Sequence, residues 1–272
     1  LRAAFAIQRL LPQFAPAVRP GEMTLFCNHD ESSLLVSILF PRAERISADA
    51  LAAALREEIP QLVGLELLAE TQRNQAPRRF AHSGNSSLLY RAAGFDFRVD
   101  QGAFFQANRW LLDAFVNRVC ANRSGALAWD LFAGVGLFAR PLAAHFARVV
   151  AVESAPDARA ALAHNLRGDA ATTEPADVLA FLRRTRKGEQ PDFIVPDLVV
   201  LDPPRTGLGA EITSLLAEIA APHIVSVSCD PATHARDLRA LLAAGYVLES
   251  LTLADLFPQT YHLETVAQLR RA

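Results

Sequence analysis

The sequence predicts an α/β protein: a mostly parallel β-sheet covered by helices on both faces, preceded by a small α+β domain. From residue 126 onward, short apolar runs of strand length alternate with longer segments of helical spacing. The apolar runs are nearly continuous, which is typical of strands buried on both faces. The last two runs have no helix between them, which predicts an antiparallel hairpin at one edge of the sheet.

Residues 1–94 are expected to form the small α+β domain. A helix over residues 1–11 is expected to stop at Pro12, and strands over 23–28 and 33–40 to form a hairpin through a turn at 29–32. Ser47 is a good N-cap for a helix over 48–58, and a strand over 62–69 follows. We interpret the polar residues 73–85 as a solvated loop or linker, with a loop that contacts a partner as the alternative.

Residues 95–272 are expected to form the second, larger domain. A strand over 95–99 and a helix ending at residue 119 open it. The following strands are predicted over 126–132, 148–153, 198–201, 224–228, 246–253 and 265–269, and the helices over 137–146, 156–166, 178–186, 210–220 and 232–244.

The composition describes a globular chain of 272 residues, 51% hydrophobic and 21% charged. Its net charge of −2 argues against binding nucleic acid over the whole surface but allows a local basic groove. The three cysteines lack CxxC spacing, so we expect neither a disulfide framework nor a zinc or iron–sulfur site. We see no membrane segment or signal peptide, and the first residue, Leu1, suggests a processed or trimmed chain. A cytoplasmic protein is expected.

One stretch points to covalent chemistry. The apolar run 223–228 ends in Cys229, and Asp230 and Pro231 then open a helix. A thiol at such a strand end can be partly exposed and directed at a ligand above the sheet. The alternative is a buried cysteine that acts as a small hydrophobic residue, as most free cysteines do.

A second stretch predicts a nucleotide-like cofactor. Asp130 to Leu137 contains Gly134 and Gly136 after the first strand of the sheet, where glycines let backbone amides approach a ligand. Glu153 ends the next strand, where an acid typically binds ribose hydroxyls. The third glycine of a dinucleotide fingerprint is absent, which favours S-adenosylmethionine over NAD. The alternative is a tight turn followed by an acid that caps a helix.

Two more acids are expected at the same edge. Asp177 ends the third strand region and Asp202 the fourth. Asp202 opens the sequence Asp202-Pro203-Pro204-Arg205, whose prolines fix a rigid turn that suits positioning of a planar base. The alternative is a plain strand terminator.

Five signatures occur in a characteristic order: residues 104–108 (FFQAN), 130–136 (DLFAGVG), 202–205 (DPPR), 228–231 (SCDP) and 255–264 (DLFPQTYHLE). Together they resemble the RNA uracil-5-methyltransferases, which make 5-methyluridine in transfer or ribosomal RNA. The resemblance covers residue 95 to the C-terminus. It implies a seven-stranded Rossmann-like sheet that binds S-adenosyl-L-methionine.

The resemblance also implies residue roles. Cys229 would be the nucleophile and Glu264 the general base, although without the motif Glu264 reads as an ordinary edge-strand acid. The other implied sites are Gln106, Phe132, Gly134, Glu153, Asp177 and Asp202 for the cofactor, and Phe105, Pro203 and Arg205 for positioning the base. Leu137 departs from the asparagine that many members carry. The family's N-terminal RNA-binding barrel and the cysteine cluster of some members have no counterpart, so no iron–sulfur cluster is expected.

The expected activity is methylation of carbon 5 of an RNA uridine through a Cys229 adduct at carbon 6 and proton removal by Glu264. We expect ribosomal RNA over transfer RNA, a single-stranded or loop uridine flipped into the site, no membrane partner and a monomer. The alternatives are a small-molecule methyltransferase on the same fold and a weakly active RNA-binding or RNA-folding module.

Overall fold

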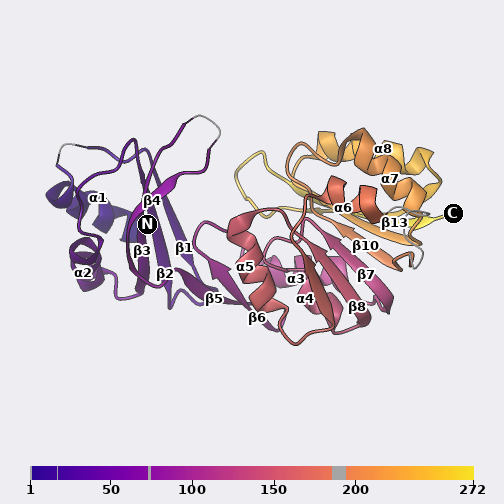
Figure 1. Ribbon diagram of the computed structural model, residues 1–272, viewed down its shortest axis with the longest axis horizontal. Coiled ribbons are helices and arrows are strands. Elements are labelled where there is room, and N and C mark those ends of the chain that lie inside the picture. Colours follow the sequence, from indigo (N-terminus) through magenta and orange to yellow (C-terminus); the bar gives the residue numbers. More distant parts are fainter. Residues whose placement is uncertain (1, 17, 73–74, 186–193) are drawn as a thin grey trace. The chain divides into compact units, whose positions relative to one another are not determined.

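The computed structural model describes residues 2–16, 18–72, 75–185 and 194–272. These divide into two compact units: residues 1–91 with 98–102, and residues 92–97 with 103–272. The first unit holds the α1, α2 and β1–β4 elements, and the second holds those from α3 onward (Figure 1). β5 (Ser87–Ala92) and β6 (Phe95–Asp100) form a two-stranded sheet where the chain passes between the units.

The first unit is a four-stranded sheet with helices on one face. Its elements are α1 (Arg2–Phe14), β1 (Glu22–Cys27), β2 (Leu34–Phe40), α2 (Ala48–Glu58), β3 (Leu62–Ala69) and β4 (Arg78–Gly84), and its strands lie in the order β1-β2-β3-β4. The predicted β1–β2 hairpin is confirmed by their antiparallel pairing. The predicted cap is also confirmed, because the Ser47 hydroxyl accepts the Ala50 N–H at 3.2 Å.

Two predictions for this unit are wrong. α1 continues through Pro12 to Phe14, and its buried residues Ile7, Leu10 and Leu11 pack into the unit's core, which outweighs the backbone hydrogen bond that proline removes. Residues 78–84 form β4 rather than a loop, antiparallel to β3. Ladder hydrogen bonds to β3 stabilise this polar edge strand. Residues 73–74 of that predicted loop lie outside the described residues.

The second unit is a seven-stranded sheet between helices. Its elements are α3 (Leu112–Cys120), β7 (Gly125–Leu131), α4 (Ala139–Ala143), β8 (Phe146–Val152), α5 (Pro156–Asn165), β9 (Ala171–Glu174), α6 (Val178–Thr185), β10 (Leu198–Leu201), α7 (Gly209–Ile219), β11 (His223–Ser228), α8 (Pro231–Ala243), β12 (Tyr246–Ala254) and β13 (Glu264–Arg271). Figure 1 shows α6, α7 and α8 over one face of the sheet, with α3, α4 and α5 on the other.

The strand order β12-β13-β11-β10-β7-β8-β9 confirms the predicted sheet and its C-terminal hairpin. β7 to β11 run parallel, and β13 inserts antiparallel between β11 and β12. From β7, the chain first adds β8 and β9 on one side of the sheet. It then returns to add β10 and β11 on the other side of β7. Ligands of such sheets bind above the carboxyl ends of the strands where the direction reverses, here β7 and β10.

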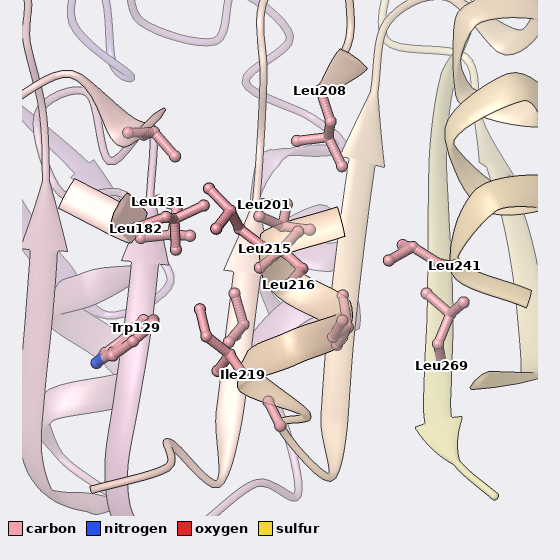
Figure 2. Close-up of a cluster of buried hydrophobic side chains, with 14 of the residues drawn as sticks. Trp129, Leu131, Leu182, Leu201, Leu208, Leu215, Leu216, Ile219, Leu241 and Leu269 are labelled. Atoms are coloured by element: carbon pink, nitrogen blue, oxygen red, sulfur yellow. The ribbon is translucent and has the colours of Figure 1, made fainter. Parts of the chain in front are cut away.

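A buried hydrophobic cluster fixes the strands under α6, α7 and α8. Figure 2 shows Trp129 and Leu131 of β7 and Leu201 of β10 facing Leu215, Leu216 and Ile219 of α7. Trp129 also packs edge-on against Phe181 of α6, with ring centroids 5.0 Å apart. Burial of side chains of this size contributes about 1.5–3 kcal/mol each. The strands whose ends carry the candidate site are therefore held in place by a packed core.

Two boundaries in this unit differ from prediction. The helix expected over 137–146 is only α4, because Phe146 pairs with Gly125 as the first residue of β8. β9 ends at Glu174, so Asp177 lies beyond the strand rather than at its end. Residue 186, the predicted last residue of the α6 helix, lies outside the described residues.

Candidate active site

Cys229 and Glu264 lie at the same edge of the sheet. Cys229 directly follows β11, and Glu264 is the first residue of β13. These strands pair antiparallel with Ser228 opposite Thr265, so the end of one meets the start of the other. Cys229 is half-buried and Glu264 is 4% exposed. The two predicted catalytic side chains are therefore neighbours in the structure.

The surroundings of Cys229 act on its thiol in opposite directions. Burial raises the pKa of Cys229, and the negative charges of Glu264 and Asp202 raise it further, whereas the Arg205 guanidinium lowers it. The residue also precedes Asp230, the N-cap of α8, where the helix dipole favours an anion. Arg205 is the nearby charged side chain that favours the thiolate over the thiol.

Glu264 is a buried carboxyl group with an unused acceptor. Its Oε2 has no hydrogen-bond partner among the described residues. Burial raises the pKa of Glu264 to about 7, against a smaller lowering by Arg205. Desolvation also raises the pKa of Asp202, and the charges of Glu264 and then Asp130 add to that rise. A carboxyl group that titrates near neutral pH suits proton transfer.

The turn after β10 is tied to helix α8. The Thr233 hydroxyl donates to the Arg205 carbonyl at 3.1 Å, and Arg236 Nη2 donates to the Thr206 carbonyl at 2.9 Å. The Leu208 N–H donates to the buried Asp237 carboxylate at 2.7 Å. These hydrogen bonds hold the turn against α8. Within it, Pro203 is buried and the Arg205 side chain is exposed.

A buried polar network joins α8 to the two strands that carry Cys229 and Glu264. His234 Nδ1 lies 2.6 Å from Thr265 Oγ1, and His234 Nε2 lies 3.1 Å from Ser226 Oγ. Thr265 Oγ1 in turn donates to the Ser228 carbonyl at 3.1 Å. Burial lowers the pKa of His234, which fits a neutral ring that donates from Nδ1 and accepts at Nε2.

Sequence reasoning missed this network. Its signal is the helical spacing of His234 with Asp237, Leu238 and Leu241, which forms the buried stripe of α8. A histidine on the buried side of such a helix needs polar partners from the sheet. Because Ser228 and Thr265 are adjacent in sequence to Cys229 and Glu264, the network fixes the backbone on which both stand.

The loop after β7 carries the two glycines predicted to contact a cofactor. Gly134 has φ +55°, and a Cβ there would meet no atom within 4 Å, so the backbone faces open space. Gly136 has φ +94°, and a Cβ there would lie 3.0 Å from Leu162 of α5. The first glycine thus permits ligand approach, and the second permits helix packing.

Glu153 closes this loop from the next strand. Its Oε2 accepts the Gly134 N–H at 2.8 Å, and its Oε1 accepts the Ala155 N–H at 2.6 Å. The Asp202 N–H donates to the Leu131 carbonyl at 3.3 Å, which places Asp202 beside half-buried Phe132. Phe132, Gly134, Glu153 and Asp202 therefore line one continuous edge.

Asp177 has a different placement. It is exposed, and its Oδ1 accepts the Leu179 and Ala180 N–H groups at 2.9 and 3.2 Å, so it caps the start of α6. Leu137, the departure from the family pattern, is buried. Asp130, on the face opposite the Trp129 cluster, is fully buried, and burial raises its pKa to about 7.

Gln106 and Phe105 lie on the loop before α3. Both are buried, and Phe105 packs against Phe97 with ring centroids 6.2 Å apart. Gln106 Oε1 is buried without a hydrogen-bond partner in the described part of the chain. Asn108 Nδ2 donates to the Leu256 carbonyl at 3.1 Å, which joins this loop to the one that precedes Glu264.

The unused Gln106 acceptor, the open backbone at Gly134 and the Glu153 carboxylate fit a ligand with an amino group and hydroxyl groups. Among the described residues, no three His, Cys, Asp or Glu side chains cluster in a way that could hold a metal ion. In the same residues, no helix has the length and apolar character needed to cross a membrane.

A family model described as tRNA (uracil-5-)-methyltransferase matches residues 31–272. The chain belongs to this family. The match confirms the resemblance found in the five sequence signatures, and it extends into the first unit, which those signatures did not reach.

Two curated relatives illustrate the family. The chain is 35% identical over 238 residues to an uncharacterized RNA methyltransferase of Nitratidesulfovibrio vulgaris, covering 84% of this chain and 50% of the relative. It is 39% identical over 196 residues to one of Streptomyces coelicolor, covering 70% of this chain and 42% of the relative. The chain thus spans about half the length of these relatives.

A solved structure confirms the fold. The chain superposes with a TM-score of 0.78 on the Pyrococcus abyssi tRNA (uracil-54, C5)-methyltransferase, which was crystallised with S-adenosyl-L-homocysteine. The identity is 22%, and the alignment covers 98% of this chain and 66% of that one. At this identity, the likeness concerns the fold.

Proposed function

We propose that this chain forms the catalytic part of an S-adenosylmethionine-dependent methyltransferase that acts on carbon 5 of a uridine in RNA. The observation that carries the proposal is the meeting of Cys229 and Glu264 at one sheet edge, beside the turn 202–205. Membership in the uracil-5-methyltransferase family supports the substrate class. The domains expected over 1–94 and 95–272 would then separate an accessory domain from a catalytic one.

Cys229 would begin the reaction. Its thiolate adds to carbon 6 of uracil, the carbon 5–carbon 6 double bond opens, and the electron pair moves toward the carbonyl oxygen on carbon 4. Carbon 5 thereby becomes nucleophilic enough to accept a methyl group. Arg205 favours the thiolate form that this step requires.

Glu264 would end the reaction. Once carbon 5 carries both hydrogen and methyl, the Glu264 carboxylate removes that proton. The freed electron pair restores the double bond, and the bond from carbon 6 to Cys229 breaks to release the thiolate. The free Oε2 acceptor of Glu264 supports this role.

S-adenosylmethionine, when bound, supplies the methyl group from its sulfonium centre. We assign its binding to Gln106, Phe132, Gly134, Glu153 and Asp202. These residues lie on the loops after β7, β8 and β10 or on the loop before α3. Asp177 stays a predicted contact, although it caps α6 through its Oδ1. Phe105, Pro203 and Arg205 would position the base, with the first two acting from buried positions.

The proposed target is a uridine in a single-stranded or looped region, because a paired base must be extruded before Cys229 can reach carbon 6. Ribosomal RNA stays the predicted substrate and transfer RNA the alternative. A monomeric, cytoplasmic protein without a membrane partner is part of the same proposal.

The experiment that tests this function is trapping of the covalent adduct. The protein is incubated with S-adenosylmethionine and an RNA containing 5-fluorouridine, whose carbon 5 has no proton for Glu264 to remove. We expect a band of lower mobility on a denaturing gel. Cys229→Ser should abolish it, and Cys27→Ser, which changes an exposed thiol, should keep it.

An unshifted wild-type band despite demonstrated RNA binding would contradict the proposal. Release of tritium from RNA labelled at carbon 5 of uridine separates the proposed activity from both alternatives. A small-molecule methyltransferase predicts no release, and a weakly active RNA-binding or RNA-folding module predicts little.

A further inference from the structure

Three large aromatic side chains are exposed on the loops that flank the candidate site. Phe104 is 73% exposed, Trp110 77% and Tyr261 85%. Phe104 and Trp110 belong to the loop of Gln106, and Tyr261 to the loop before Glu264. Exposed apolar side chains that gather around one site can mark a binding surface.

The exposed Trp110 ring is paired with a cation. The Arg109 guanidinium lies over the ring, 4.6 Å from its centroid. A cation in this position polarises the indole and brings a positive charge next to an apolar plate. The pair thus brings a stacking surface and a positive charge together within two adjacent residues.

Tyr261 also packs against the side chain of its neighbour in sequence, and its contacts lead into the site. Its ring centroid lies 4.1 Å from that of His262, and the planes are inclined by 44°. His262 Nε2 lies 3.3 Å from Arg205 Nη2, and the charge of Arg205 acts on both Cys229 and Glu264. Tyr261 is therefore the outermost member of a row of planar groups that starts beside the nucleophile.

The two loops are anchored to each other. Asn108 and Leu256, 9% and 3% exposed, are joined by the hydrogen bond from Asn108 Nδ2 to the Leu256 carbonyl. Asn108 Oδ1 also accepts the N–H groups of Trp110 and Leu111 at 3.2 and 3.1 Å. The backbone beneath Trp110 is thus held in place before any ligand binds.

We infer that Trp110 and Tyr261 form a stacking surface for unpaired RNA bases next to the target uridine, with the positive charge of Arg109 beside Trp110. The inference rests on the proposed function and adds residues outside its catalytic and cofactor sets. With a net charge of −2, the chain lacks the general positive surface that non-specific RNA binding requires. Stacking of bases on aromatic rings contributes affinity for single strands in addition to local basic side chains.

The test measures binding, without methylation. A fluorescently labelled single-stranded RNA of about twelve nucleotides with one central uridine is titrated with protein, and anisotropy gives the dissociation constant. Trp110→Ala and Tyr261→Ala should each weaken binding by about 5- to 150-fold, because stacking contributes about 1–3 kcal/mol per base. Trp110→Phe and Tyr261→Phe should retain most of the affinity.

Two controls separate stacking from general damage. Phe5→Ala removes an aromatic ring of comparable exposure, 64%, from helix α1 of the first unit, and should leave affinity unchanged. The chain has two tryptophans, and Trp129 is 3% exposed. RNA should therefore quench wild-type tryptophan fluorescence through Trp110, and Trp110→Phe should abolish the quench.

The inference is wrong if both alanine variants bind the RNA with the wild-type affinity. It is also wrong if the wild-type protein binds the duplex form of the same RNA more tightly than the single strand, or binds neither form. A change in the sedimentation of Trp110→Ala without a change in RNA affinity would show that Trp110 contacts a second copy of the chain. This result would also overturn the inference. If the 5-fluorouridine adduct does not form but RNA binding still depends on the Trp110 and Tyr261 rings, only the proposed function is contradicted.

Discussion

Glu264 combines three properties that an ordinary acid at the start of a strand lacks. It is buried, one of its oxygens has no hydrogen-bond partner among the described residues, and it faces a thiol across an antiparallel strand pair. Burial keeps its pKa near 7, so the carboxyl group can accept a proton at neutral pH without being a permanent anion beside the Cys229 thiolate.

Glu264→Gln should therefore stop the reaction after methyl transfer. Glutamine keeps the shape of the side chain but cannot accept the carbon 5 proton, so the methylated RNA should stay attached to Cys229. We expect the adduct to accumulate with ordinary uridine RNA and turnover to fall by at least about 100-fold, the lower end of general-base contributions. Gel electrophoresis with a radiolabelled methyl group detects the adduct.

The same step has a predicted pH dependence. Only deprotonated Glu264 acts as a base, so breakdown of the wild-type adduct should speed up as pH rises through about 7 and level off above it. Glu264→Gln should show no such rise. Wild-type turnover by this variant, or a flat wild-type profile between pH 5.5 and 8.5, would exclude the role.

At the level of elements, the turn between β10 and α7 depends on glycine for space as well as conformation. Gly207 has φ +73°, and a Cβ there would lie 2.3 Å from Asp237 Oδ2 and 2.7 Å from Thr233 Cγ2. These are the α8 residues that bind the turn. Gly209 has nearly the same φ, +76°, but a Cβ there would meet no atom within 4 Å.

Gly207→Ala and Gly209→Ala therefore form a matched pair. Both pay for a left-handed backbone, about 1–2 kcal/mol, but only Gly207→Ala also forces the turn away from α8, at a further cost of about 1–3 kcal/mol. Urea unfolding should show this difference. Adduct formation should fall in Gly207→Ala and persist in Gly209→Ala. Equal losses in the two variants would argue against a role for the contacts between this turn and α8.

Elements whose signals are local could be predicted from the sequence. The apolar runs and helical segments of the second unit gave β7, β8, β10, β11, α5, α7 and α8 within a few residues, because continuous apolar strands and amphipathic helices carry their pattern within themselves. β4 could not be predicted, since its polar residues are held by hydrogen bonds to β3. The same holds for Phe146, which pairs with Gly125 instead of extending α4.

The site shows the same division. Cys229, Asp202 and Glu153 were found because each lies at or directly after the end of a predicted strand. The meeting of Glu264 with Cys229 depends on β13 inserting between β11 and β12, and no local pattern encodes that order. The His234 network depends on the same insertion, since Thr265 belongs to β13 and Ser226 to β11.

On the scale of the whole molecule, the chain consists of two units with separate cores. Every residue assigned to the cofactor or to catalysis lies in the second unit. A ligand that binds only one folded unit stabilises that unit and leaves the other unchanged unless the two are coupled.

S-adenosylhomocysteine at about 100 times its dissociation constant should therefore slow amide hydrogen exchange in the second unit, by up to about 100-fold where exchange requires opening of the liganded state. The loops at 132–137 and 153–155 should be most affected, and strands β2 and β3 should exchange at the same rate with and without ligand. Glu153→Ala should reduce the protection. Equal slowing in both units would contradict separate domains.

The pairing of β12 with β13 has a consequence for the loop between them. Ala254 lies opposite Glu264, so the loop at 255–263 begins and ends at two adjacent points held by the sheet. The position of the Glu264 carboxylate is therefore set by the strand pair, and not by the exposed residues of the loop. A substitution of an exposed loop residue such as Tyr261 should leave that carboxylate in place.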